Sequence, residues 1–443
     1  MKIDAMHDMI IRRNMGIKSG IPSYCTSNDL VLEAILQQGK RFRDEILIEG
    51  TANQINQFGG YTGMHPADFR DMVYEIADRV GFPRGKIILG GDHLGPLTWA
   101  DENEDSAMQK AEDLVREFVL AGYKKIHLDT SMRVADDPID EMLSTRTIAR
   151  RGARLYKVCE EAYQQLLKDN PEEMRPSYII GSEVPIPGGE QSADASVQVT
   201  SPEALRETID IYKEEFSQLG MGDLFHTIVG IVTQPGVEFG DEKIVHYDRV
   251  KAAALRDAIA EYPDMVLEGH STDYQSPDAL REMVEDGVGI LKVGPALTFA
   301  LREGLFALSC MEAELVPEEK RANLPAIWDQ VMLDDPKNWG KYYQGTDEEK
   351  ALKRKYSLSD RSHYYYNAPA VQEAIAKLFA NLDEVHIPLG MVRQYMPQQF
   401  LKICKGTLPC KARELAKDKV VEITEDYNYA TKYNYITASA LVK

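Results

Sequence analysis

The chain has 443 residues, 44% of them hydrophobic, which is enough for one large α/β domain with an extension or for two ordinary domains. It carries 71 acidic and 51 basic residues, and the formal net charge of -20 opposes binding to nucleic acid or to an anionic membrane surface. Five cysteines without a Cys-x-x-Cys pair give neither a disulfide framework nor a zinc-finger pattern. No apolar run is long enough to span a bilayer, so we expect a cytoplasmic protein without a membrane segment.

Eight short apolar or β-branched runs recur along the chain, and segments of helical period lie between them. The runs cover residues 20–27, 45–52, 86–93, 124–131, 178–185, 226–234, 264–271 and 287–294. This alternation predicts a (β/α)8 TIM barrel over residues 1–310. No Gly-x-Gly-x-x-Gly follows the first run, which disfavours a dinucleotide-binding sheet. Without a low-complexity linker, we expect residues 311–443 to form a mostly helical extension packed on the barrel.

Polar side chains follow the predicted strands at the points where the strands end. Functional residues of a TIM barrel lie at the carboxyl ends of its strands, so these side chains are expected to face one mouth. They are Asp92 and His93 after the third strand, Asp129 after the fourth, Glu183 after the fifth, Gln234 after the sixth, and His270 and Ser271 after the seventh. Imidazole and carboxylate groups are ligands of zinc and related ions. We predict a divalent metal held by His93, His270 and Gln234 or Glu183, the alternative being histidines that only cap the barrel.

Three carboxylates are candidate catalytic groups: Asp92, Glu183 and Asp129. Asp92 precedes a predicted ligand and is expected to act as general acid/base, unless it only orients His93 or caps a helix. His127 lies one step deeper than Asp129 on the same face of its strand, and we expect a structural role for it.

Lys292 stands inside the otherwise apolar run "GILKVG". A lysine there could be a Schiff-base nucleophile, could pair with a barrel carboxylate, or could extend outward to solvent. A metal site would make the nucleophile redundant, so we disfavour that role and leave the other two open.

A phosphate commonly binds near the ends of the seventh and eighth barrel strands. Gly269, Ser271 and Gly294 lie at these two places, and Arg361 is a candidate for the positive charge. Glycines that form ordinary turns and a solvated arginine are the alternatives.

Ordered blocks along nearly the whole chain resemble one known family. They include "GIPSYCTSNDLVLEA", "ILGGDHLGPLTW", "KIHLDTSM", "GSEVPIPGG", "LEGHSTDYQ" and "YSLSDRSHYYYN". Together they are similar to the Z subunit of tagatose-bisphosphate aldolase, the GatZ/KbaZ family. The resemblance implies a barrel like that of class II metal-dependent aldolases, with a role in stabilising and activating a catalytic Y subunit. Some relatives are instead 4-epimerases of ketohexoses or their phosphates.

The resemblance also implies site residues. Asp92 matches the acid/base, His93 and His270 match metal ligands, and Asn28 in the first block is expected near the substrate. Where the aldolases present another histidine, this chain has Gln234, whose amide oxygen binds zinc less tightly. Mn²⁺ or Mg²⁺ are therefore alternatives to Zn²⁺, which is the expected ion.

These expectations combine into one functional hypothesis, metal-dependent C3–C4 chemistry on a ketose or ketose phosphate. The protein would be a tagatose/fructose 4-epimerase or a tagatose-bisphosphate aldolase component, and the alternative is a non-catalytic stabilising subunit. A Y-type subunit or a second copy of the chain is the expected protein partner. The phosphorylation state of the substrate stays open.

Overall fold

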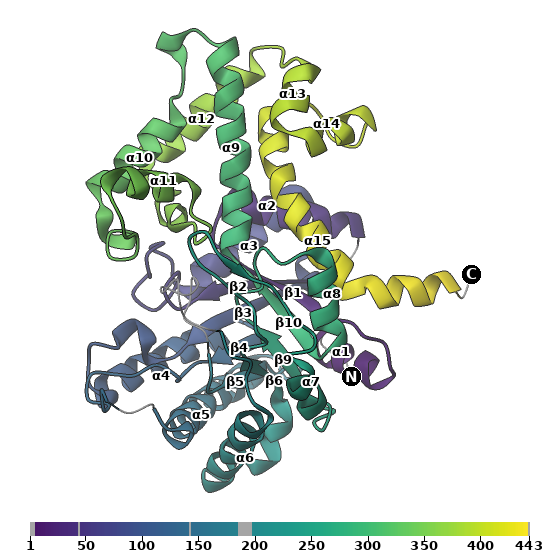
Figure 1. Cartoon of the computed structure of the whole chain (residues 1–443). Coiled ribbons are helices and arrows are strands. Elements are labelled where there is room, and N and C mark those ends of the chain that lie inside the picture. Colours follow the sequence, from purple (N-terminus) through teal and green to yellow (C-terminus); the bar gives the residue numbers. More distant parts are fainter. Residues whose placement is uncertain (1–4, 43–44, 141–142, 185–196, 442–443) are drawn as a thin grey trace.

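The computed structural model describes residues 5–42, 45–140, 143–184 and 197–441, and its centre is a closed barrel of eight parallel strands (Figure 1). The strands are β1 (Ile21–Cys25), β2 (Ile46–Thr51), β3 (Ile87–Leu94), β4 (Lys125–Leu128), β5 (Ser177–Gly181), β6 (Ile228–Thr233), β9 (Val266–Gly269) and β10 (Val288–Val293). They neighbour one another in chain order, and β10 closes the barrel on β1. Each strand overlaps one of the eight predicted runs, so the predicted TIM barrel is confirmed.

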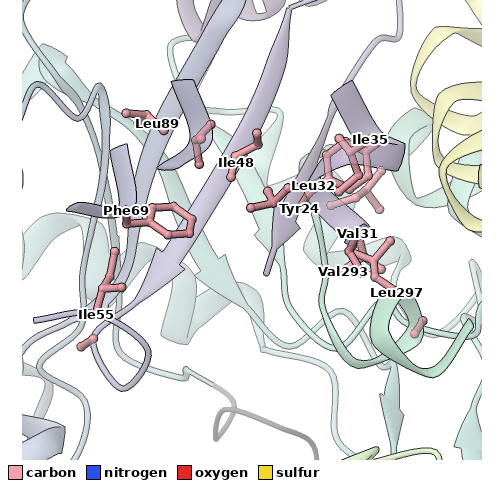
Figure 2. Packing of buried hydrophobic residues seen from close by; sticks show 14 of the residues in the cluster. Tyr24, Val31, Leu32, Ile35, Ile48, Ile55, Phe69, Leu89, Val293 and Leu297 are labelled. Carbon is pink, nitrogen blue, oxygen red and sulfur yellow. The ribbon is translucent and has the colours of Figure 1, made fainter. Parts of the chain in front are cut away.

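Helices surround the barrel and bury apolar faces against it. They are α2 (Asp29–Phe42), α3 (Pro66–Val80), α4 (Glu104–Leu120), α5 (Thr145–Asp169), α6 (Pro202–Gln218), α7 (Ala253–Ile259), α8 (Pro277–Glu285) and α9 (Pro295–Leu315). Figure 2 shows part of the layer between helix and sheet, where Phe69 of α3 packs near Ile48 of β2 and Leu89 of β3. A short hairpin of β7 (Glu238–Phe239) and β8 (Ile244–Val245) interrupts the connection between β6 and α7.

The barrel interior changes from apolar to charged along the strand direction. Its lower part is an apolar cluster that α1 (Ala5–Asn14) joins with Met6, Met9 and Ile10. The strand residues of this cluster include Leu47, Val266 and Ile290. Because side chains alternate across a strand, the residues two positions further on share the same face. These are Glu49, Glu268 and Lys292, so a charged layer lies directly below the carboxyl ends of the strands.

The C-terminal region is helical and packs against the barrel helices (Figure 1). Its helices are α10 (Leu324–Asp334), α11 (Asp347–Tyr356), α12 (Pro369–Asp383), α13 (Leu389–Tyr395), α14 (Pro397–Cys404) and α15 (Ala412–Leu441). Helix α9 runs continuously through residue 310, where the sequence places the start of the extension, and that boundary stays a prediction. Helix α15 contacts α2, α8 and α9, and Glu33 of α2 binds Arg413 and Lys417 of α15 at 2.6 and 2.7 Å. In the described part of the chain, no helix is both long and apolar enough to cross a bilayer.

Candidate active site

A pocket opens at the carboxyl ends of the strands, where the predicted site should lie. Asp92, His93, His270 and Lys292 line it together with Asn28, Ser271 and Gly294. A second group of lining residues comes from outside the barrel, at the segment His363–Asn367 of the C-terminal region. The barrel supplies the charged part of the pocket, and the C-terminal region supplies an aromatic wall.

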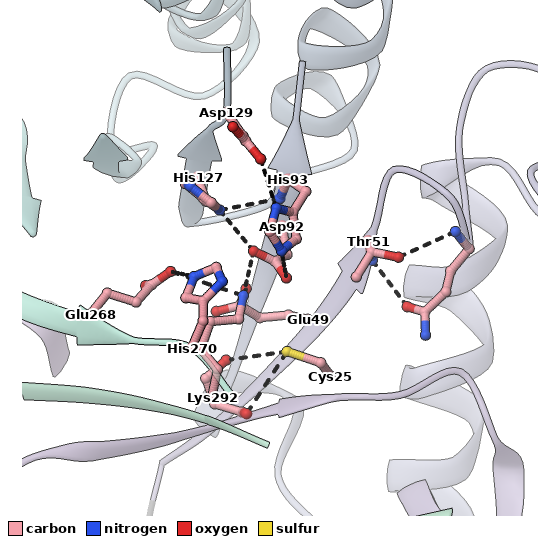
Figure 3. Close-up of polar contacts among 12 residues, drawn as sticks. Cys25, Glu49, Thr51, Asp92, His93, His127, Asp129, Glu268, His270 and Lys292 are labelled. Carbon is pink, nitrogen blue, oxygen red and sulfur yellow. Dashed lines mark hydrogen bonds and ion pairs between the residues drawn. The ribbon is translucent and has the colours of Figure 1, made fainter. Parts of the chain in front are cut away.

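Three imidazole rings lie together at this end of the barrel, with ring centroids 4.9 to 5.3 Å apart (Figure 3). Each ring has one nitrogen against a buried carboxylate. The pairs are His93 Nδ1 with Asp129 Oδ2 at 2.7 Å, His127 Nδ1 with Asp92 Oδ1 at 2.8 Å, and His270 Nε2 with Glu268 Oε1 at 2.9 Å. A carboxylate behind an imidazole fixes the ring and makes the opposite nitrogen a better metal ligand.

The site meets a geometric requirement for a metal centre. One ligand atom from each of Asp92, His127, Glu268 and His270 can be chosen so that all four lie within 4.8 Å of one another, and all four residues are buried. Nε2 of His127 is also buried and has no hydrogen-bond partner. An unsatisfied buried polar atom costs about 1–3 kcal/mol, which a bound cation would recover. The residues present therefore fit a divalent cation.

The balance of charges around the three imidazoles also favours a divalent cation. Lys125 binds Glu49 and Glu268 at 2.8 and 2.7 Å, and Lys292 binds Glu49 at 2.9 Å and also contacts Asp92. With Asp129, this described cluster holds four buried carboxylates against two ammonium groups. If all three imidazoles are neutral, two negative charges are left over, which matches one divalent cation. Burial alone would lower the pKa of His93, but Asp92 and Asp129 raise it, and a protonated ring there would reduce the excess to one negative charge.

The environment sets the ionisation of the individual groups. Burial opposes ionisation of Asp92, but the neighbouring His93 and Lys292 outweigh it and hold the pKa of Asp92 well below its usual value. Burial lowers the pKa of His270 to about 3, so this ring is neutral and able to bind a cation. Burial alone would lower the pKa of Lys292, yet Asp92 and other acidic neighbours raise it well above its usual value. Lys292 is thus an ion-paired ammonium, which disfavours the Schiff-base role.

The backbone is unusual at two of these residues. His93 has φ 49° and Ser271 has φ 52°, in the left-handed region that non-glycine residues seldom adopt and that is frequent at functional sites. Gly95 allows the next turn, because a Cβ there would lie 1.6 Å from the backbone oxygen of Asp129. The last glycine of the "GGDHLG" sequence is thus required by the close approach of the segments after β3 and β4.

Some predicted residues lie elsewhere. The side-chain oxygen of Gln234 accepts hydrogen bonds from the backbone N–H groups of Gly236 and Val237 at 2.8 and 3.0 Å. Glu183 is exposed and accepts a hydrogen bond from Thr200 at 2.5 Å. Neither residue lines the pocket, so the structure does not bring them to the imidazoles. Asp129 lies behind His93, where it also binds Ser131 at 2.6 Å.

The predicted phosphate-binding residues are only partly assembled. Ser271 and Gly294 line the pocket, whereas Gly269 lies within β9 and is not part of the lining. Arg361 donates a hydrogen bond to the backbone oxygen of Asn338 at 3.1 Å and stacks on the ring of Tyr342 at 3.1 Å. It does not line the pocket either.

Several important residues were missing from the sequence interpretation. Glu49, Lys125 and Glu268 carry most of the charged layer, and a charged residue inside an apolar strand was the available signal, which we applied only to Lys292. The structural role expected for His127 accounts for the hydrogen bond of its Nδ1 to Asp92, but it does not account for the buried Nε2, which has no partner. His363 and Tyr364 had no periodic signal, because they lie in a short 3-10 helix, Arg361–Tyr365, far along the chain.

Comparisons with known proteins show the family to which the chain belongs. Residues 6–432 match the family model described as D-tagatose-1,6-bisphosphate aldolase subunit GatZ/KbaZ-like. The chain belongs to this family. A D-tagatose-1,6-bisphosphate aldolase subunit GatZ from Klebsiella pneumoniae is 45% identical over 96% of the chain and 98% of the relative, and one from Escherichia coli is 45% identical over 96% and 99%. A crystal structure of a probable tagatose 6 phosphate kinase from Sinorhizobium meliloti superimposes with a TM-score of 0.84 at 43% identity, covering 93% of this chain and all of that one.

Proposed function

We propose that this family member is itself an enzyme of ketohexose C3–C4 chemistry that depends on a divalent metal. Its reaction is the reversible aldol cleavage of a tagatose- or fructose-configured ketose or ketose phosphate, completed either as 4-epimerisation or as release of the two fragments. The observation that carries the proposal is the position of Asp92, which lines the same pocket as His93 and His270 and belongs to the buried group that could hold the metal.

The candidate ligands are His127 and His270, with Asp92 and Glu268 completing the buried group and His93 beside it. Zn²⁺ suits this donor set, and Mn²⁺ or Mg²⁺ are the alternatives. When bound, the cation supplies Lewis acidity that stabilises negative charge on the ketose oxygens.

Asp92 moves the proton in this proposal. Its Oδ1 is held by His127 and Lys292, while Oδ2 lies 3.7 Å from His93 Nε2. Oδ2 takes the proton of the C4 hydroxyl as the C3–C4 bond breaks, and the bond electrons pass to the C2 carbonyl to give an ene-diolate and an aldehyde. Lys292 keeps Asp92 ionised between cycles, which readies the oxygen for the next proton.

The fate of the aldehyde decides between the two outcomes. If it leaves, Asp92 passes its proton to C3 of the ene-diolate, and the reaction is an aldol cleavage. If the aldehyde turns its other face to C3 and is attacked again, Asp92 returns the proton and C4 is inverted. The wall formed by Tyr61, His363 and Tyr364 favours keeping the aldehyde in the pocket. The rings of Tyr61 and Tyr364 have centroids 4.8 Å apart and join two separate chain segments in the lining of the pocket.

A non-catalytic stabilising subunit is the second candidate, because the relatives carry the name of an aldolase subunit. A pure scaffold has no need for this many desolvated polar groups in one pocket, which argues for the enzyme.

The test uses the isolated full-length chain with Zn²⁺, Mn²⁺ or Mg²⁺. Fructose, tagatose, their 6-phosphates and tagatose 1,6-bisphosphate are followed by chromatography for epimers and for triose products. Epimer or triose formation by the chain alone is expected. If the chain alone forms no product from any substrate but activates an added Y-type subunit, the result would support the non-catalytic subunit instead.

A further inference from the structure

The end of the pocket beside β9 and β10 contains a carboxylate where a phosphate was expected. Asp273, in the loop after β9, accepts hydrogen bonds from the backbone N–H groups of Gly294 and Ala296 at 3.0 and 2.9 Å. These groups form the N-terminus of α9, and Asp273 lines the pocket while being only 3% exposed. Its carboxylate therefore already occupies the two backbone donors that a phosphate at this helix end would use.

Apart from the proposed metal, which is to bind the ketose oxygens, the described lining offers no free lysine or arginine to a phosphate. Among the described residues that line the pocket, Lys292 is the only lysine or arginine, and it is paired with Asp92 and Glu49. A phosphate placed near Asp273 would meet a buried negative charge without a compensating partner, which is a costly arrangement.

The proposed reaction site lies close to this carboxylate. Asp273 follows His270 by three residues, so their Cα atoms are within roughly 10 Å of each other. A ketohexose whose C2–C4 atoms contact Asp92 and His270 therefore extends one chain end toward Asp273. A carboxylate accepts hydrogen bonds from sugar hydroxyls, and so it suits a free hydroxyl at that end.

We propose that Asp273 selects substrates whose chain end at α9 is a free hydroxyl and rejects those with a phosphate there. This inference rests on the proposed function and extends it to the substrate class. A ketohexose bisphosphate carries phosphate at both ends, so it must bring one to Asp273 in either orientation. An unphosphorylated ketose or a monophosphate can avoid this.

The experiment compares the wild type with Asp273→Asn, which keeps the size and the hydrogen-bond acceptor and removes the charge. For each protein, kcat/KM is measured for a ketohexose, its 6-phosphate and its 1,6-bisphosphate. We expect the wild type to favour the first two over the bisphosphate by at least about tenfold, and the variant to reduce that ratio by at least about tenfold. The matched control is Asp286→Asn, a buried acid bound to Arg249 and Tyr247 outside the pocket, which should leave the ratio unchanged.

A binding measurement separates this inference from the proposed function. Isothermal titration with the same three ligands should show discrimination against the bisphosphate that disappears in Asp273→Asn, even if no ligand is turned over. Turnover or binding of the bisphosphate equal to that of the monophosphate by the wild type would overturn the inference. An unchanged ratio in a folded Asp273→Asn would also overturn it, and Asp273→Ser, which keeps a capping oxygen, replaces that variant if it does not fold.

Discussion

At the scale of single residues, the site depends on Asp92, whose two carboxylate oxygens have different roles. Oδ1 of Asp92 binds His127 at 2.8 Å and contacts Lys292, so one oxygen is fully engaged in the charged layer. Oδ2 is the oxygen left for a substrate proton. The same residue therefore keeps the cluster together and faces the pocket.

Replacing Asp92 by Asn keeps the shape of the side chain and removes its basicity. We expect kcat to fall by a factor of about 10² or more, because general acid/base catalysis contributes roughly that much. Steady-state kinetics with the preferred ketose measures the effect, and circular dichroism confirms that the variant is folded. Asp101→Asn, at an exposed position, is the control and should retain full turnover. Wild-type turnover in Asp92→Asn would remove Asp92 from the mechanism.

At the scale of elements, the periodicity of the sequence predicted the strands and helices. It did not predict contacts between side chains of different elements. The eight strands were predictable because each is an apolar run between helical segments, and His93 and His270 were predictable because they follow such runs. Glu268 and Glu183 show the limit of predicting site residues from strand ends. Both are glutamates near strand ends, but Glu268 lies within β9 and points into the barrel behind His270, whereas Glu183 follows the end of β5 and is exposed.

The contact of the C-terminal region with the barrel also depends on two elements far apart in the sequence, α2 and α15. Glu33 of α2 lies against Arg413 and Lys417 of α15, positions separated by more than three hundred residues. Burial opposes its ionisation, but hydrogen bonds from the two cations outweigh that effect and lower the pKa of Glu33 to about 2. No local pattern in the sequence indicates this pairing.

Glu33 should make stability depend on pH. Its folded pKa of about 2 lies below the unfolded value of 4.5, so its contribution is complete above about pH 4.5 and is lost as the pH falls toward 2. By linkage this is at most about 3 kcal/mol. Urea unfolding should show Glu33→Gln less stable than wild type at pH 6, with the difference shrinking toward pH 3. Glu75→Gln, on the exposed face of α3, should differ little from wild type at either pH. A pH-independent difference for Glu33→Gln would contradict a stabilising contact of ionised Glu33 with Arg413 and Lys417.

At the scale of the whole molecule, the pocket combines parts that fold far apart in the sequence. The barrel contributes the charged cluster through β2, β3, β4, β9 and β10, and the C-terminal region contributes the aromatic wall. Asp360 joins the two parts, since it binds Thr298 and Arg302 of α9 and lies next to the segment that carries His363. Closure of the barrel is thus what assembles four carboxylates, two ammonium groups and three imidazoles in one buried place.

The central claim is that this assembled cluster holds one divalent cation that turnover requires. The most direct measurement titrates the metal-free protein with Zn²⁺ and with Mn²⁺ and records bound metal and ketose conversion in the same samples. Both should rise together and level off at one equivalent. In His127→Gln, which removes the unpaired Nε2, metal affinity should fall by about 10–100-fold, whereas His226→Gln at an exposed site should behave like wild type. Full conversion by the metal-free protein, or unchanged metal affinity in His127→Gln, would contradict the account.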